Sequence, residues 1–162
     1  MKLGSTLWHT PNFSTREICT QAKFVEDIGF DSFWLPENHF SEAAIPDPLM
    51  LLAAASAETT SLKLGTSSLL ITLRDPLLTA ESISVLDNLS GGRIIIGVGR
   101  GFVKQTLEAF NVNPREKRET FEKNLLLIRK SLRGERIKIN DQTEAVITLS
   151  PATIQNPHPP IW

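Results

Sequence analysis

Four short apolar segments alternate with four helical patterns along this sequence, and this alternation constrains the fold more than any other feature. The apolar segments are residues 2–7, 31–35, 62–71 and 93–98. The helical patterns that follow them are at about 14–29, 47–58, 75–88 and 114–132. Strands that alternate with helices at intervals of roughly 30 residues favour a parallel sheet with right-handed crossovers. The sequence therefore predicts an α/β fold built of parallel β/α units.

Local signals mark where the helices begin. Asp47-Pro48 and Asp75-Pro76 each place an N-cap carboxylate before a proline, whose missing N–H costs nothing in the first turn of a helix. Ser14 and Glu17 have the spacing of a capping box. We therefore expect helices to start at these three points.

The regular alternation stops after Gly134. Residues 136–139 and 145–149 flank Asn140-Asp-Gln and predict a hairpin, so residues 135–160 read as an inserted hairpin and a proline-rich extended segment. Ile161-Trp162 looks like the start of a fifth strand. A complete (β/α)₈ barrel needs about 250 residues. We therefore expect residues 1–162 to be a fragment of a longer barrel, a half-barrel that pairs with another copy, or a small open-sheet protein.

Charge and cysteine content exclude several classes of partner and site. Lysine and arginine number 17 against 18 acidic residues, with no basic run, so nucleic acid and anionic membranes are poor partners. The single Cys19 excludes an internal disulfide and fits a reducing compartment. The three histidines are widely separated, so we expect no metal site. No apolar run has the length of a membrane span or a signal peptide, so we expect a cytoplasmic protein.

A glycine-rich segment follows the strand at 93–98. Gly97, Gly99 and Gly101 leave the backbone bare around Arg100, at the carboxyl end of a strand, where ligands bind in α/β folds. A guanidinium there predicts an anion, most simply a cofactor phosphate. The spacing is neither G-x-G-x-x-G nor a P-loop. Packing at a strand exit explains the glycines equally well.

Polar residues also follow the second and third strands. Glu37, Asn38 and His39 place a carboxylate, an amide and an imidazole together, and histidine can move a proton near neutral pH. A histidine bonded within its loop and packed under Phe40 is the alternative. The small side chains in Gly65-Thr-Ser-Ser68 permit a flat ligand against the backbone, or else close packing of a helix.

Together these motifs resemble the N-terminal half of the bacterial luciferase-like flavin monooxygenase family. The resemblance rests on Gly29-Phe-Asp-Ser-Phe-Trp34, Glu37-Asn-His-Phe40, Leu64-Gly-Thr-Ser-Ser68, Asp87-Asn-Leu-Ser-Gly-Gly-Arg93, Gly97-Val-Gly-Arg-Gly101 and Asn156-Pro-His-Pro-Pro-Ile-Trp162. It implies a TIM barrel with an excursion before strand five, of which residues 1–162 are the N-terminal portion. It also implies that reduced FMN or a deazaflavin coenzyme binds at the carboxyl ends of the strands.

The resemblance implies roles for the cofactor-binding residues. Thr66, Ser67 and Ser68 match a β-bulge behind the flavin ring, where the family often carries a non-proline cis peptide. Arg100, with Gly99 and Gly101 beside it, matches the arginine that meets the flavin phosphate. An arginine there is more similar to the FMN branch than to the deazaflavin branch.

The catalytic loop departs from the family pattern. Luciferases resemble Glu-His-His-Phe here, and their first histidine is assigned to catalysis, whereas this chain has Asn38, which cannot take a proton at neutral pH. The resemblance therefore implies that His39 donates a hydrogen bond near the reactive edge while Asn38 orients the ring system, with Glu37 the third candidate catalytic residue.

The resemblance also implies an activity and partners. The leading expectation is a monooxygenase that uses reduced FMN and dioxygen on a small organic substrate, with a flavin reductase as a possible source of reduced flavin. The alternatives are a deazaflavin-dependent reductase or dehydrogenase, and a non-catalytic flavin-binding subunit or inactive fragment. The family forms dimers through the helices after strands two and three, so a homodimer is expected. Because the family's site also uses later strands, we expect the chain alone to bind FMN weakly or not at all.

Overall fold

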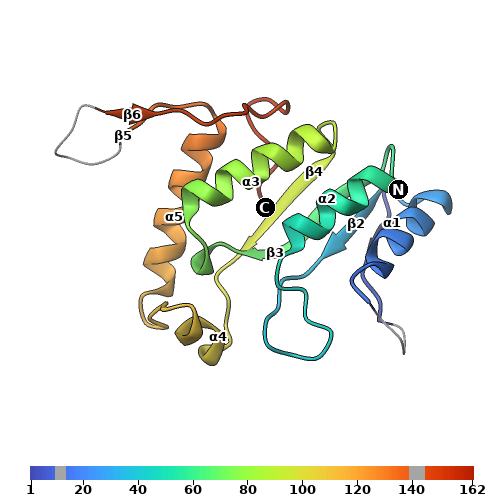
Figure 1. Cartoon of the computed structure of the whole chain (residues 1–162), viewed down its shortest axis with the longest axis horizontal. Helices are drawn as coiled ribbons and strands as arrows, with labels where there is room; N and C mark the ends of the chain where they lie inside the picture. The colour runs from blue at the N-terminus through green and yellow to red at the C-terminus, as the bar shows by residue number, and fades with distance from the viewer. Residues whose placement is uncertain (10–13, 139–144) are drawn as a thin grey trace.

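The computed structural model describes residues 1–9, 14–138 and 145–162, and its centre is a parallel sheet (Figure 1). The strands are β1 (Gly4–Thr6), β2 (Ser32–Leu35), β3 (Lys63–Leu70) and β4 (Ile94–Gly99). Their order in the sheet is their order in the chain, and each neighbouring pair is parallel. Ile161 extends this series, because it bridges Ile96 of β4 in the parallel direction.

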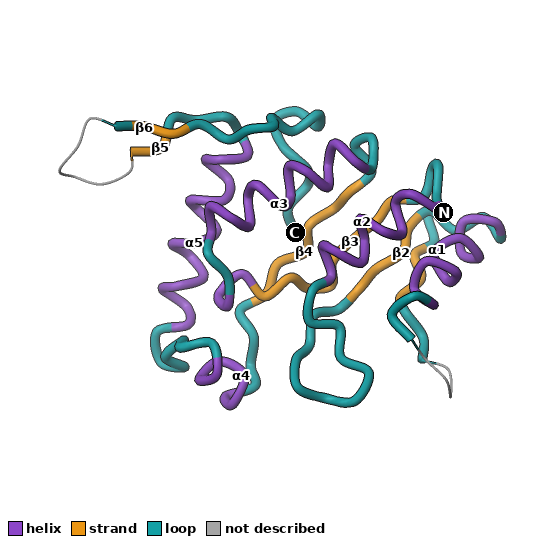
Figure 2. Tube along the Cα trace, viewed as in Figure 1, coloured by secondary structure: helices purple, strands orange, loops and turns teal. Residues whose placement is uncertain are grey.

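Helices connect these strands. They are α1 (Glu17–Asp27), α2 (Pro48–Glu58) and α3 (Pro76–Leu89), with α4 (Lys104–Ala109) and α5 (Lys117–Leu132) after β4. Helices α2 and α3 lie over the same face of the sheet (Figures 1 and 2). Sequential strand order with crossovers of one hand is the arrangement of a TIM barrel, whereas a doubly wound sheet reverses its order. The predicted α/β fold is confirmed as part of a TIM barrel.

Two of the three predicted helix starts are confirmed. The Asp47 carboxylate accepts a hydrogen bond from Met50 N at 3.3 Å, and the Asp75 carboxylate accepts one from Leu78 N at 2.8 Å. The predicted capping box was wrong. Arg16 is the N-cap of α1 and already has helical backbone angles, and its side chain makes no cap hydrogen bond. The N–H of Glu17 bonds to the backbone oxygen of Ser14 instead, so Ser14 belongs to a preceding turn.

The core lies between the sheet and the helices. Its largest fully buried side chains come from all four of the early β/α units and include Ile18, Phe33, Leu35, Leu52, Leu64, Leu69, Ile83 and Ile94. Trp34 points away from this core and stacks on Trp162, with ring centroids 5.3 Å apart. A Cβ on Gly65 would lie 2.2 Å from the Trp34 ring, so only glycine allows that ring to lie flat on β3.

Two charged residues stabilise the end of the sheet where the strands begin. The Arg93 guanidinium donates to backbone oxygens of Ser56, Thr59, Leu62 and Ser90, and so joins the end of α2 to the start of β4. The buried Asp87 carboxylate accepts hydrogen bonds from the backbone N–H groups of Ile154 and Gln155 and from the Gln155 side chain. Asp87 and Arg93, the first and last residues of the motif at 87–93, therefore stabilise the fold. They lie away from the carboxyl ends of the strands, where ligands bind in α/β folds.

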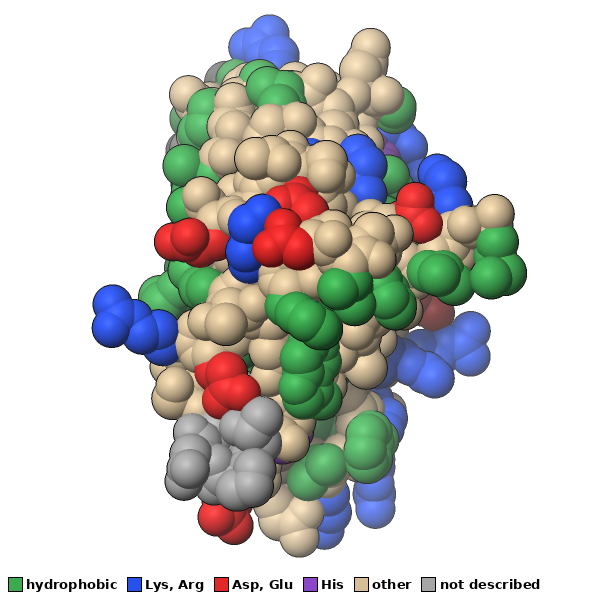
Figure 3. All heavy atoms as spheres, turned by 90° about the vertical axis from the view of Figure 1, so that its right-hand side faces the viewer, with side chains coloured by type: hydrophobic (Ala, Val, Ile, Leu, Met, Phe, Trp, Pro, Cys, Tyr) green, Lys and Arg blue, Asp and Glu red, His purple; other side chains and the backbone are tan. Residues whose placement is uncertain are grey.

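After α5 the chain forms a small hairpin. β5 (Ile137–Lys138) and β6 (Val146–Ile147) pair antiparallel as predicted, and the predicted turn at Asn140–Gln142 lies outside the described residues. In the part of the chain that the structure describes, none of the helices combines the length and the apolar character needed to span a bilayer. Acidic and basic side chains are interspersed on the face shown in Figure 3.

Candidate functional site

A cleft opens where β2, β3 and β4 end. Its volume is about 670 Å³, in the range of small-molecule sites. The loop after β2 and helix α4 both lie beyond this edge of the sheet (Figure 1). The lining consists of residues 36–39, 41, 67, 68, 70, 73, 99–103, 106 and 107.

Eight of the nine candidate residues from the sequence line this one cleft. They are Glu37, Asn38, His39, Ser67, Ser68, Gly99, Arg100 and Gly101. The ninth, Thr66, is fully buried, and its hydroxyl donates to the backbone oxygen of Gly97 at 2.8 Å. Thr66 lines a second cavity of about 480 Å³ that shares Ser67 and Ser68 with the cleft.

The bulge expected from the resemblance is present in β3. The Ser67-Ser68 peptide is cis, and the register between β3 and β4 shifts between Thr66 and Leu69. The glycines of β4 make room for this bulge. A Cβ on Gly97 would lie 2.3 Å from the Thr66 backbone oxygen, and one on Gly99 would lie 2.2 Å from the Ser68 hydroxyl. Close packing between strands therefore accounts for both glycines.

Arg100 is an exposed cation at the cleft. Its backbone oxygen accepts a hydrogen bond from the Thr72 hydroxyl at 2.9 Å, which fixes the main chain at this point. Gly101 follows with φ of +70°, a left-handed angle that turns the chain at the end of β4. Within the described residues, the Arg100 guanidinium has no ion-pair partner. It is therefore available to an anion.

Glu37 is the centre of a buried polar cluster beside the cleft. Its side chain is fully buried. One carboxylate oxygen accepts from Leu70 N at 2.7 Å, and the other accepts from Arg74 Nε at 3.3 Å and Arg74 Nη2 at 3.1 Å. His39 Nε2 lies 3.0 Å from that second oxygen. The carboxylate thus ties the loop after β2 to the end of β3.

His39 and Asn38 have different partners. The His39 side chain is 7% exposed, with the Phe110 ring edge-on at 4.9 Å and Phe40 at 5.8 Å. The Asn38 side-chain oxygen accepts from Ile45 N at 2.6 Å, and Asn38 N donates to Ile45 O at 3.1 Å. Asn38 therefore closes the loop after β2, and its oxygen bonds to that loop and not to His39.

Sequence reasoning missed Arg74 and the wall of the cleft that α4 supplies. Arg74 precedes the Asp75-Pro76 helix start, and only its position beside that signal distinguished it. It also donates to Pro46 O at 3.2 Å. Phe102, Val103 and Leu107 come from α4 and the segment before it. A helix of six residues is too short for an apolar period to show.

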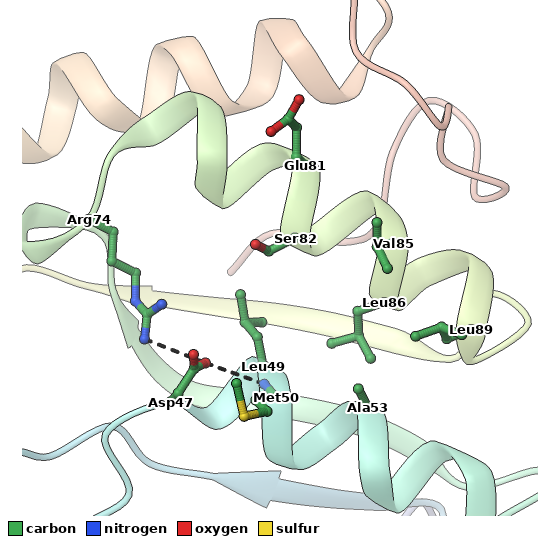
Figure 4. Close-up of a pocket in the computed structure, with 10 residues that line it drawn as sticks. All are labelled: Asp47, Leu49, Met50, Ala53, Arg74, Glu81, Ser82, Val85, Leu86 and Leu89. Carbon is green, nitrogen blue, oxygen red and sulfur yellow. Dashed lines mark hydrogen bonds and ion pairs between the residues drawn. The ribbon is translucent and has the colours of Figure 1, made fainter.

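A separate groove lies between α2 and α3 (Figure 4). It has a volume of about 350 Å³, and Leu49, Ala53 and Leu86 point into it. Met50 and Leu89 at its rim are 70% and 63% exposed. The described residues include no cluster of three or more histidine, cysteine or acidic side chains that could hold a metal ion.

Comparisons with known proteins agree with this architecture. The sequence model described as luciferase-like monooxygenase matches residues 3–162. Limonene 1,2-monooxygenase of Rhodococcus erythropolis is 30% identical over 135 residues, which are 80% of this chain and 35% of that protein. The crystal structure of monooxygenase RslO1 from Streptomyces bottropensis superposes with a TM-score of 0.87 at 32% identity, over 99% of this chain and 52% of that one.

A reductase is similar as well. The coenzyme F420-dependent tetrahydromethanopterin reductase of Methanopyrus kandleri superposes with a TM-score of 0.73 at 25% identity, over 99% of this chain and 49% of that chain. The chain thus spans about half the length of the solved structures that it matches, and less of the limonene enzyme.

Proposed function

The chain belongs to the luciferase-like monooxygenase family, and we propose that it supplies the flavin-site half of a monooxygenase that uses reduced FMN and dioxygen on a small organic substrate. The observation that carries the proposal is the cleft, which brings His39, the Ser67-Ser68 bulge and Arg100 from three successive strand ends to one space. In this proposal residues 1–162 are the N-terminal portion of one (β/α)₈ domain, and residues 135–160 are an excursion before strand five.

The residues of the cleft fit the cofactor. The exposed Arg100 guanidinium and the turn at Gly101 suit a phosphate, since arginine binds phosphate through two N–H groups at once. The small side chains of Ser67 and Ser68 leave room for a flat ring on the same wall. When bound, reduced FMN supplies the electrons with which dioxygen is activated.

The other side chains that line the cleft exclude water from it and supply a group that can transfer a proton. Leu70, Leu73, Val103 and Leu107 give the cleft an apolar wall that excludes water from a bound substrate. The His39 imidazole, held against Glu37, is the group that holds or moves a proton at this site.

A second candidate is a deazaflavin-dependent reductase or dehydrogenase. The similarity to the F420-dependent reductase favours it, because that protein shares this fold over the whole of this chain. Binding of F420 in preference to FMN would favour this alternative.

We also propose that two copies associate through the groove between α2 and α3. Met50, Leu78 and Leu89 expose 63% or more of their surface on these helices, which is apolar area that a second copy would bury. A flavin reductase as the source of reduced FMN is part of the same proposal.

Binding of FMN and riboflavin to matched variants tests the flavin site. Arg100→Gln should weaken FMN binding about 10-fold or more, because it removes a hydrogen bond to a charged phosphate. It should leave riboflavin binding unaffected, because riboflavin has no phosphate. Arg115→Gln is the control, because Arg115 is exposed and lies outside the cleft. Equal losses in the two variants, or equal losses for the two flavins, would contradict the proposal.

A further inference from the structure

All three histidines have a ring nitrogen that faces an oxygen, and in two of them, His39 and His158, the distance is 3.0 Å or less. His39 Nε2 lies 3.0 Å from a carboxylate oxygen of Glu37, and His158 Nδ1 lies 2.7 Å from the backbone oxygen of Pro159. An ionised carboxylate and a carbonyl can only accept hydrogen bonds. The facing nitrogen must therefore carry the proton in each case, and the two residues have opposite neutral tautomers.

Hydrogen-bond donors surround the Glu37 carboxylate. Leu70 N donates to one oxygen, and Arg74 donates twice to the oxygen that His39 faces. Arg74 is itself held by Pro46 O at 3.2 Å and by the Asp47 carboxylate at 3.7 Å. With the guanidinium donating twice to this oxygen, the geometry favours the Glu37 carboxylate as the acceptor of the hydrogen bond from His39 Nε2.

The other ring nitrogen of His39 is left open. A neutral imidazole carries one N–H, so a proton on Nε2 makes Nδ1 an acceptor. In the described residues no side chain or backbone group bonds to Nδ1. Phe110 and Phe40 pack on the ring and limit its rotation.

We propose that Glu37 and Arg74 are positioning residues that fix His39 as its Nε2–H tautomer, so that Nδ1 accepts a proton from a ligand in the cleft. In that step the donor's bond to hydrogen breaks, its electron pair stays on the ligand, and the proton forms a bond with Nδ1. The imidazolium then faces the Glu37 carboxylate. The proposal rests on the proposed function for the identity of the ligand, and it reverses the donor role that the resemblance implies for His39.

Nuclear magnetic resonance on the chain without flavin tests the tautomer. With ¹⁵N-labelled histidine, long-range ¹H–¹⁵N correlations show which ring nitrogen is protonated, and His39→Gln identifies the signals of His39. We expect an Nε2–H signal for neutral His39 that exchanges slowly with water, and an Nδ1–H pattern for His158 in the same spectrum. An Nδ1–H pattern for His39, or a rapidly exchanging mixture of tautomers, would overturn the proposal.

Variants test the two positioning residues. In Glu37→Gln the amide NH₂ can donate to Nε2, so the Nδ1–H form of His39 should appear. Arg74→Lys keeps the charge but loses the paired contact, so the Nε2–H proton should exchange faster with water. Glu42→Gln, an exposed residue of the same loop, should change neither signal. If both Glu37→Gln and Arg74→Lys leave the His39 signals unchanged, neither residue positions the ring. These spectra are recorded without a cofactor. Their outcome therefore tests the tautomer of His39 separately from the proposal that the cleft binds FMN.

Discussion

Glu26 is predicted to stabilise the fold by a pH-dependent amount. Its carboxylate, at the end of α1, accepts from the backbone N–H groups of Thr60, Ser61 and Leu62 at 2.7 to 3.0 Å. Burial raises its pKa, but these hydrogen bonds outweigh burial and lower the pKa from 4.5 to about 2. One pKa unit is about 1.36 kcal/mol, so the ionised form contributes about 3 kcal/mol to stability.

The sign of this contribution follows from the lowered pKa. The stability is fully present above pH 4.5, and it is lost as the pH falls toward 2, where folded and unfolded chains both bind the proton. Glu26→Gln should therefore lower the free energy of unfolding by about 3 kcal/mol at pH 7, and by progressively less below pH 4.5.

Urea denaturation followed by tryptophan fluorescence, at a series of pH values, measures this difference. Glu58→Gln is the matched control, since Glu58 is exposed and its loss should cost less than about 0.5 kcal/mol. A Glu26→Gln effect equal to that of the control, or one that does not shrink at low pH, would refute the reasoning.

Three further predictions concern the bulge, the groove and the isolated chain. Gly97→Ala should destabilise the chain by about 1–3 kcal/mol in urea, and by more than Gly99→Ala, because its new Cβ meets a backbone oxygen and not a hydroxyl that can rotate; equal costs would contradict this. Met50→Glu should shift sedimentation toward the monomer, whereas Phe24→Glu on α1, where Phe24 is 53% exposed, should not; a sedimentation coefficient unchanged by Met50→Glu would exclude the groove as the interface. Isothermal titration of residues 1–162 should give an FMN affinity weaker than micromolar, because these residues span only 52% of the similar monooxygenase RslO1; sub-micromolar binding would contradict this unless sedimentation shows that a dimer forms.

Much of the fold could be predicted from local chemistry. Asp47-Pro48 and Asp75-Pro76 placed two helix starts correctly, because the cap and the proline act within one turn. Ser14 and Glu17 have the right spacing for a cap, but Arg16 between them already has helical backbone angles. Spacing alone therefore predicts a cap only where the preceding residue is extended.

The position of the candidate site could be predicted from the sequence, but the hydrogen bonds and ion pairs within it could not. Parallel strands bring their carboxyl ends together, so residues after β2, β3 and β4 had to meet at one edge. The contact between Arg74 and Glu37 joins residues 37 positions apart, and no local pattern encodes it. The bond from Ile45 to Asn38 depends in the same way on the path of the loop after β2.

Mapping FMN on the chain tests the central claim most directly. In ¹H–¹⁵N spectra recorded during an FMN titration, which detect weak binding as well as tight binding, the backbone amides of Ser67, Ser68, Gly99, Arg100 and Gly101 should shift together. Riboflavin should shift the serines but affect Arg100 and Gly101 less, because it lacks the phosphate. If the shifted amide signals instead belong to residues along the groove between α2 and α3, the cleft is not the flavin site. The same holds if the signals of these five amides do not shift at saturating FMN.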